Sequence, residues 1–253
     1  SLLYLKIQKD VTVFYTEGSY KDSNFGMHWL NYLLFKYARG HWCVTCDPDE
    51  FLVYPHVDTR DLRDLTEYLS SINEDAMFAL MVDMYSKQPV EESYYEVGSD
   101  PLEACPYFDA YGYTKFYYKK YRNLFVQGGV RRRVFAKNNP ASAPALNKVP
   151  LIKWRWNHVY VESMHMALPR RLNTGCYHTK TTGALLHYKF ISQLSEKVKE
   201  ELVSKQHYND SAEYKQYDAV IKKKNILYKE GVSARFNSWK DLARLGLINK
   251  GEW

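Results

Sequence analysis

The chain has 253 residues, 45% hydrophobic and 25% charged, so it is long enough to bury a core and lacks the composition of a disordered protein. Lysine and arginine number 35 against 29 aspartates and glutamates, and this mildly basic balance suits an anionic ligand or an anionic membrane surface. The longest clean apolar run, Ala76 to Val82, is far too short to cross a bilayer, so no transmembrane helix is predicted.

The first third of the chain alternates between strand and helix patterns. Strands are expected where short stretches are β-branched, aromatic or almost continuously apolar, and helices where apolar residues recur every three and four positions. The predicted strands are Val11 to Tyr15, Trp42 to Cys46, Phe51 to Tyr54 and Ala76 to Met84, and the predicted helices are Phe25 to Tyr37 and Asp61 to Ile72. This alternation predicts an α/β fold with an open, mostly parallel sheet flanked by helices.

The remaining two thirds of the chain are less regular. Proline and glycine interrupt Lys87 to Tyr113, which is therefore expected to be a long irregular excursion over the sheet. Leu124 to Phe135 alternates after a Gly-Gly pair and is predicted to be an antiparallel edge strand or a hairpin. The other predicted elements are a strand at Val149 to Trp156 and helices at Ser192 to Lys205, Ser211 to Leu227 and Ser238 to Ile248.

The four cysteines are scattered along the sequence. Cys43 and Cys46 fall on one predicted strand, where positions three apart point to opposite faces, so this spacing argues against a chelating pair. We predict four free thiols and a reducing compartment.

The stretch CVTCDPDEFLVY (residues 43–54) places three carboxylates directly after a predicted buried strand. In an open α/β sheet, ligands bind at the carboxyl ends of the strands, which is where Asp47, Asp49 and Glu50 are expected. Pro48 stiffens the spacing of the two aspartates, and paired carboxylates favour Mg²⁺ or Mn²⁺, which leave positions open for phosphate oxygens. The alternative, an acidic turn whose aspartates cap the following chain, stays open.

Several ordered blocks of the sequence resemble the family 2 glycosyltransferases, in particular a bacterial subgroup with a D-x-D-E-F block. The blocks are a run from Glu17 to Pro55 that contains DPDEF, and further on MVDMYS (Met81 to Ser86), GGVRRRVF (Gly128 to Phe135), NKVPLIKW (Asn147 to Trp154) and LLHYKF (Leu185 to Phe190). The resemblance covers most of the chain and implies a GT-A fold, a nucleotide-sugar donor and Mn²⁺ or Mg²⁺.

The resemblance also implies roles for individual residues. Asp47 and Asp49 would occupy the metal and donor-diphosphate positions, and His187 would complete the metal ligands, although a structural histidine is the other interpretation. Lys189, two residues on, would meet a phosphate. Phe51 is expected to pack into the core.

Arg131 and Arg133 would share one face of a strand, where forked guanidinium groups suit the departing diphosphate or an anionic acceptor. A solvent-facing strand edge explains them equally well. A transfer with inversion also needs a base near the anomeric carbon. The expected base is Asp83, at the end of a buried strand, with Asp100, Glu103 and Asp109 as rivals, because the resemblance does not identify it.

The leading hypothesis is therefore a metal-dependent, inverting glycosyltransferase that moves a sugar from a nucleotide diphosphate to a glycan or a lipid-linked acceptor, as in polysaccharide biosynthesis. The expected location is cytoplasmic, and contact with the inner face of the plasma membrane stays open. Tyr111 to Arg122, which is basic and rich in tyrosine, would touch anionic headgroups or stack on sugars, or would form a half-buried aromatic hairpin. No nucleic-acid partner is expected.

Two alternatives remain at this point. One is a metal-dependent nucleic-acid-binding or phosphodiester-cleaving protein, since carboxylates on a metal and basic aromatic patches also serve there. The other is a non-catalytic remnant of a glycosyltransferase. The resemblance implies a partial GT-A domain at residues 1–190 that lacks its first strand-helix units, followed by a helical extension at residues 191–253 that packs on the same domain.

Overall fold

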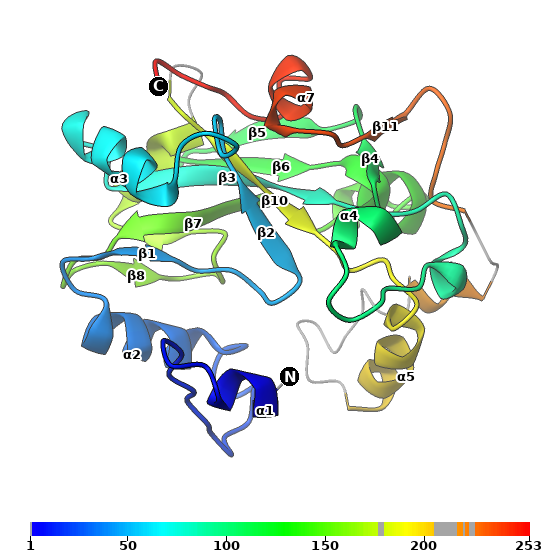
Figure 1. Cartoon of the computed structure of the whole chain (residues 1–253), viewed down its shortest axis with the longest axis horizontal. Coiled ribbons are helices and arrows are strands. Elements are labelled where there is room, and N and C mark those ends of the chain that lie inside the picture. The colour runs from blue at the N-terminus through cyan, green and yellow to red at the C-terminus, as the bar shows by residue number, and fades with distance from the viewer. Residues whose placement is uncertain (1, 177–179, 205–216, 220, 223–225) are drawn as a thin grey trace.

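The structure is a computed structural model that describes residues 2–176, 180–204, 217–219, 221–222 and 226–253. It is a mixed α/β protein with a curled five-stranded sheet and several helices around it (Figure 1). The α/β class predicted from the sequence is confirmed at this level.

The helices largely coincide with the predicted ones. They are α1 (Leu2–Lys6), α2 (Met27–Tyr37), α3 (Leu62–Ser71), α4 (Pro101–Ala104), α5 (Leu194–Ser204) and α7 (Trp239–Arg244). Short 3₁₀ segments lie at Val90–Glu92, Pro140–Ser142 and Arg170–Cys176, and a π-helical turn lies at Arg131–Phe135. α3 begins where Asp61 caps the backbone N–H groups of Arg63 and Asp64, at 2.7 and 3.0 Å. The helix predicted at Ser211 to Leu227 lies mostly outside the described residues.

The central sheet has the strand order β1-β7-β3-β10-β2. Its strands are β1 (Trp42–Val44), β7 (Asn147–Lys153), β3 (Ala76–Asp83), β10 (Gly183–His187) and β2 (Glu50–Val53). Only β3 and β10 pair in parallel, and the other three neighbouring pairs are antiparallel. The predicted mostly parallel sheet is therefore wrong, because β7 enters from late in the chain between β1 and β3, and β2 joins the far edge.

Three two-stranded sheets complete the strands. They pair β4 (Tyr107–Asp109) with β11 (Ser233–Arg235), β5 (Thr114–Tyr118) with β6 (Asn123–Gln127), and β8 (Val159–Tyr160) with β9 (Ala167–Leu168). The C-terminal stretch thus contributes a strand as well as helices. No helix among the described residues is long and apolar enough to cross a membrane.

The helices α2 and α3 cover opposite faces of the central sheet. Ala76 and Met77 are neighbours on β3, so their side chains point to opposite sides. Ala76 packs in a core with Leu34 of α2, whereas Met77 packs in a second core with Leu65 and Leu69 of α3. Figure 1 shows the two helices on either side of β1 and β7. Burial on both faces explains why the sequence of β3 is almost continuously apolar.

One predicted strand is wrong, and another is shorter than predicted. Val11 to Tyr15 forms no strand and no ladder, and Phe14 and Tyr15 are 51% and 81% exposed. The predicted strand Leu124 to Phe135 stops at Gln127, because Gly128 and Gly129 take backbone torsions with φ of 159° and 59° and turn the chain into the π-helical segment. A Cβ at Gly128 would lie 2.6 Å from the backbone of Tyr113, so only glycine fits there.

Burial of β3 between two layers predicts a large stability effect at Leu80, which is 2% exposed. We expect Leu80→Ala to lower the free energy of unfolding by about 2–5 kcal/mol, because it removes buried apolar contacts and leaves a cavity. Leu3→Ala is the matched control, since Leu3 is 81% exposed, and should change it by less than about 0.5 kcal/mol. Urea unfolding followed by circular dichroism measures both, and equal effects of the two substitutions would contradict the assigned core.

Candidate functional site

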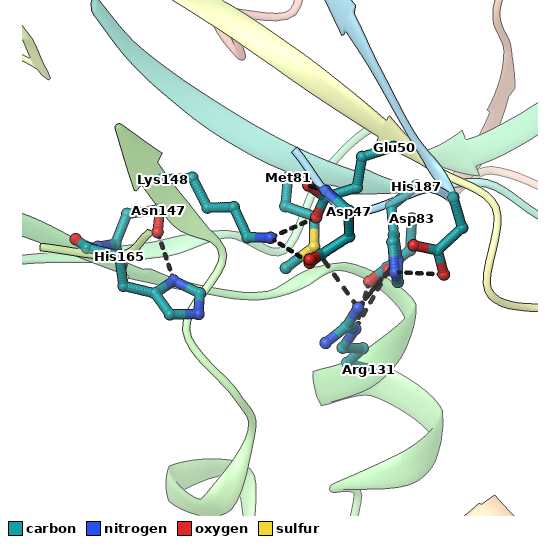
Figure 2. Close-up of polar contacts among 10 residues, drawn as sticks. Asp47, Glu50, Met81, Asp83, Arg131, Asn147, Lys148, His165 and His187 are labelled. Carbon is teal, nitrogen blue, oxygen red and sulfur yellow. Dashed lines mark hydrogen bonds and ion pairs between the residues drawn. The ribbon is translucent and has the colours of Figure 1, made fainter. Parts of the chain in front are cut away.

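Polar side chains gather at one edge of the central sheet, where β1, β3 and β10 end and β2 and β7 begin (Figure 2). The register pairs His187 with Asp83 on one side and with Glu50 on the other. Directly paired residues on neighbouring strands project from the same face of a sheet, so these three side chains form one row. All three are buried, with exposed fractions of 4–6%.

Arg131 reaches this row from the π-helical turn. Its Nε lies 2.9 and 3.1 Å from the two carboxylate oxygens of Asp83, and its Nη2 lies 2.9 Å from one of them. Burial opposes ionisation of Asp83, but the charge of Arg131 and a hydrogen bond from His187 outweigh it and lower the pKa of Asp83 to about 2. The carboxylate predicted to be the base is thus held ionised in a buried ion pair.

His187 connects Asp83 with Asp49. Its Nδ1 lies 2.7 Å from Asp83 Oδ1 and 2.9 Å from Nη2 of Arg131. Because a carboxylate only accepts, Nδ1 carries the hydrogen in the shorter contact, with Asp83. The opposite ring nitrogen, Nε2, lies 3.4 Å from Asp49 Oδ2. Burial alone would lower the pKa of His187, but the hydrogen bonds with Asp49 and Asp83 raise it above its usual value. Although partial burial of Asp49 works against its ionisation, the contact with His187 lowers the pKa of that carboxyl.

The other aspartate of the acidic turn has a different partner. Asp47 Oδ2 lies 2.9 Å from Nζ of Lys148, which also binds Glu50. Lys148 and Glu50 are both buried, whereas the Asp47 side chain is 56% exposed. The structure therefore places Asp47 and Asp49 at the same sheet edge, as the sequence suggested, but directs their carboxylates to separate partners.

Arg133 lies apart from Arg131 and does not share its partners. It binds Asp109 through Nε and Nη2 at 2.8 and 2.7 Å and the carbonyl of Leu227 at 2.7 Å. Asp109 also accepts a hydrogen bond from the buried hydroxyl of Tyr85. This second ion pair joins the π-helical turn, β4 and the C-terminal segment. The prediction of two arginines side by side on one strand face is wrong, because a helical turn spreads neighbouring side chains around its axis.

The remaining predicted residues lie outside the row. Asp100 caps the start of α4 by accepting from the N–H of Leu102 at 2.9 Å, and Glu103 is exposed on the same helix. Lys189 Nζ lies 4.6 Å from the ring of Tyr217. Phe51, expected in the core, is instead 48% exposed and packs edge-on against Tyr188.

Two residues of this site were not singled out from the sequence. Lys148 lies inside the block NKVPLIKW, and a lone lysine beside four apolar positions of a strand is the signal that could have identified it. His165 offered no comparable signal. Figure 2 shows its ring beside Asn147, on the same side of the sheet edge as Lys148 and Arg131.

The described residues contain no group of three or more histidine, cysteine, aspartate or glutamate side chains arranged to hold a metal ion. The pair Asp49 and His187 nevertheless presents one carboxylate oxygen and one imidazole nitrogen to each other. Ions such as Mg²⁺ are commonly held by one or two protein side chains together with substrate phosphates and water, so this donor pair fits an ion that arrives with a diphosphate.

Two surface hollows of about 430 and 630 Å³ lie elsewhere, on the two sides of α3. The smaller is lined by Trp253 and Tyr68, and the larger by Trp42 and Lys153. Neither hollow is lined by a residue of the row, so the hollows and the row of charged side chains lie in different regions of the molecule. The row, by contrast, brings buried charged side chains within hydrogen-bonding distance of one another, as the contacts of Arg131 with Asp83 and of Lys148 with Glu50 show.

Comparisons with protein-family models, with curated proteins and with solved structures found no match for this chain.

The buried ion pair predicts a specific stability effect. Arg131→Met should lower the free energy of unfolding by about 3–5 kcal/mol, because it leaves the Asp83 carboxylate buried without its cation. Adding Asp83→Asn should recover part of this loss. The pKa of Asp83 is lowered, so the stabilisation is present above pH 3.8 and is lost as the pH falls toward about 2.

Urea unfolding at several pH values measures this effect. The difference between wild type and Arg131→Met should therefore shrink as the pH falls from about 4 to about 2. Arg244→Met is the control, since the Arg244 side chain is 76% exposed in its pair with Asp241, and should change stability by less than about 0.5 kcal/mol. A loss at Arg131 no larger than at Arg244 would contradict the role of the ion pair.

Proposed function

We propose that the protein is a metal-dependent glycosyltransferase of the family 2 type with a GT-A fold, which moves a sugar from a nucleotide diphosphate to a hydroxyl acceptor with inversion. The observation that supports this most is the chain of contacts from Arg131 through Asp83 and His187 to Asp49. A buried carboxylate that fixes one nitrogen of a histidine, while the other nitrogen faces a second carboxylate, is typical of metal-ligand histidines.

Asp49 and His187 would hold Mn²⁺ or Mg²⁺ in this proposal. The charge balance of the site supports a cation, because four carboxylates (Asp47, Asp49, Glu50 and Asp83) stand against two permanent positive charges and one histidine. When bound, such an ion would neutralise the charge that develops on a leaving diphosphate. Asp47 and Lys148 would lie beside it, with the lysine able to exchange its carboxylate partner for a phosphate.

The acceptor is proposed to be a glycan or a lipid-linked glycan. No carboxylate that was considered as the base lies in this row without a hydrogen-bond or ion-pair partner. Asp83 and Asp109 are each bound to a buried or half-buried arginine, and Asp100 caps a helix. These positions favour structural and orienting roles for all three.

Binding of UDP tests the donor site. Isothermal titration of UDP into the chain should give heat with Mn²⁺ and little without it, because the ion bridges the protein and the diphosphate. Asp49→Asn and His187→Asn should each weaken metal-dependent binding at least about tenfold, which is the range seen when metal ligands or their orienting partners are lost. Asp10→Asn, which changes an exposed carboxylate outside the row, is the control.

Metal-independent heat that survives both substitutions would contradict the proposed donor site. A chain silent to UDP would be titrated with GDP, which separates a wrong base from a missing site. A salt-dependent mobility shift on adding DNA, without any response to nucleotide-sugars, would favour the nucleic-acid alternative instead.

Contact with an anionic membrane surface is proposed for the β5–β6 hairpin. β5 and β6 form an antiparallel hairpin whose rings Phe116 and Tyr117 are 50% and 43% exposed, so the half-buried aromatic hairpin considered from the sequence is present and still offers part of each ring to a surface. The hairpin, residues 114–127, contains four lysines and arginines and no aspartate or glutamate. Partly exposed aromatic rings beside these cations suit the interface of an anionic bilayer.

Sedimentation with vesicles tests this contact. The chain should bind vesicles of phosphatidylserine and phosphatidylcholine more than vesicles of phosphatidylcholine alone. Lys119→Gln with Lys120→Gln should reduce binding about thirtyfold, because each cation contributes about 1 kcal/mol. Phe14→Ser with Tyr15→Ser, which changes exposed aromatic residues elsewhere, should leave it unchanged. Equal binding to both kinds of vesicle would contradict an electrostatic contact.

A further inference from the structure

His165 is held in one orientation by four hydrogen bonds. Its backbone N–H donates to the carbonyl of Glu162 at 3.2 Å, and its own carbonyl accepts from the side-chain amides of Asn123 and Asn147 at 2.8 and 3.2 Å. The ring joins this network through Nδ1, which lies 2.6 Å from the backbone carbonyl of Asn147. The segment before β9 is thereby fixed against the beginning of β7.

The contact with Asn147 fixes the tautomer of the ring. A backbone carbonyl only accepts hydrogen bonds, so Nδ1 of His165 must carry the hydrogen. In the neutral ring, Nε2 then has a lone pair. Within the described part of the chain, no group donates a hydrogen bond to this nitrogen.

The ring belongs to the same electrostatic environment as the row of site residues. Burial and the positive charges of Lys148 and Arg131 lower the pKa of His165 to about 4, and the charge of Asp47 partly opposes them. Figure 2 shows the ring of His165 at one end of the group, Lys148 and Asp47 between, and Arg131 and His187 at the other end. His165 is therefore neutral at pH 7 and lies beside the site.

His158 shows what a purely structural histidine looks like in this fold. Its pKa is also lowered to about 4, by burial and by the charge of Arg171. Both of its ring nitrogens have partners, since Nδ1 accepts from the N–H of Arg155 at 3.2 Å and Nε2 lies 3.2 Å from Nη2 of Arg171. The difference between the two histidines is the unengaged Nε2 of His165.

We propose that His165 is the general base of the transfer, an inference that rests on the proposed function. The acceptor oxygen forms a bond to the anomeric carbon, and the bond from that carbon to the phosphate oxygen breaks with its electron pair leaving on the nucleoside diphosphate. The proton of the acceptor hydroxyl passes to Nε2 of His165, which becomes an imidazolium and later releases the proton to water.

The surrounding charges make this base dependent on the donor. An imidazolium beside Lys148 and Arg131 is disfavoured while the site holds no anion, because like charges repel. A bound diphosphate brings negative oxygens to these cations and offsets the repulsion. His165 thus becomes a stronger base when the donor is bound. In a site without the donor, His165 is only a weak base toward a water molecule.

The test uses His165→Asn, because the amide N–H of asparagine can replace Nδ1–H toward Asn147 while Nε2 is lost. Release of UDP from UDP-glucose should fall by about 10²–10⁴-fold, the usual contribution of a general base. Affinity for UDP with Mn²⁺ and the midpoint of thermal unfolding should stay close to wild type. His158→Asn is the matched control and should leave turnover within about threefold.

A second measurement needs no turnover. Long-range ¹H–¹⁵N correlation spectra of the full chain labelled in its histidines, with His165→Asn used for assignment, report the tautomer and the pKa directly. We expect the Nδ1–H tautomer at pH 7 and a pKa that rises when UDP and Mg²⁺ are added, since the diphosphate offsets Lys148 and Arg131.

The outcomes distinguish a failure of the proposed function from a failure of the role proposed for His165. A wild-type chain that binds neither UDP nor GDP overturns the proposed function. A chain that binds UDP, but keeps its turnover in His165→Asn or shows the Nε2–H tautomer, overturns the role of His165 alone. If UDP-glucose is not turned over, the tautomer and the UDP-dependent rise in pKa decide, and a pKa unchanged by UDP counts against the base.

Discussion

The buried ion pair between Arg131 and Asp83 is the interaction on which the site depends. A carboxylate at the end of a central strand, 4% exposed, would ionise only at a large free-energy cost if it were alone. The guanidinium removes that cost and leaves an ionised acceptor for Nδ1 of His187. With Nδ1 engaged, Nε2 is the nitrogen that faces Asp49. The orientation of His187 therefore depends on an arginine that binds Asp83, the carboxylate on the far side of the ring from Asp49.

The backbone makes this arrangement possible through two local features. The parallel pairing of β3 with β10 brings Asp83 and His187 side by side at the ends of their strands. The Gly128–Gly129 pair ends β6 and lets the next residues coil instead of continuing the strand, which directs Arg131 inward. A buried ion pair is weak support for stability when compared with apolar packing. In this site, the ion pair instead fixes the position of the hydrogen on His187 and the orientation of its ring.

Local sequence pattern predicted those parts of the fold that local physics determines. α3 was predicted from its apolar period, and β3 from an apolar run that burial on both faces requires. Strand direction was not predictable in the same way. The residues of β7, Asn147–Lys153, carry no local signal that this strand will insert between β1 and β3 and pair antiparallel with both. Val11 to Tyr15 has a strand composition but no neighbouring strand to pair with, so composition alone misled the prediction.

The same distinction between local pattern and distant contacts applies to the candidate site. Asp47 and Asp49 were placed at a strand end from their position, and His187 was joined to them by the family resemblance; the structure brings all three to one edge of the sheet. Their partners were not predicted, because Lys148 is 101 residues from Asp47 and Arg131 is 48 from Asp83. Arg131 was noticed for its charge, but its burial was invisible until the helical turn replaced the expected strand.

Two histidines at this edge show how one residue type can be set to two tasks. Both rings donate Nδ1–H, but His187 donates to a carboxylate and His165 to a neutral carbonyl. Hydrogen bonds with carboxylates on both sides raise the pKa of His187, whereas burial near Lys148 and Arg131 lowers that of His165 to about 4. Groups of the same kind whose surroundings move their pKa values apart commonly have distinct roles in one reaction. In the proposed transferase, His187 would serve the leaving diphosphate through the metal, and His165 the incoming hydroxyl. The charges of Lys148 and Arg131 keep His165 neutral, and these are the charges that a bound donor diphosphate would neutralise.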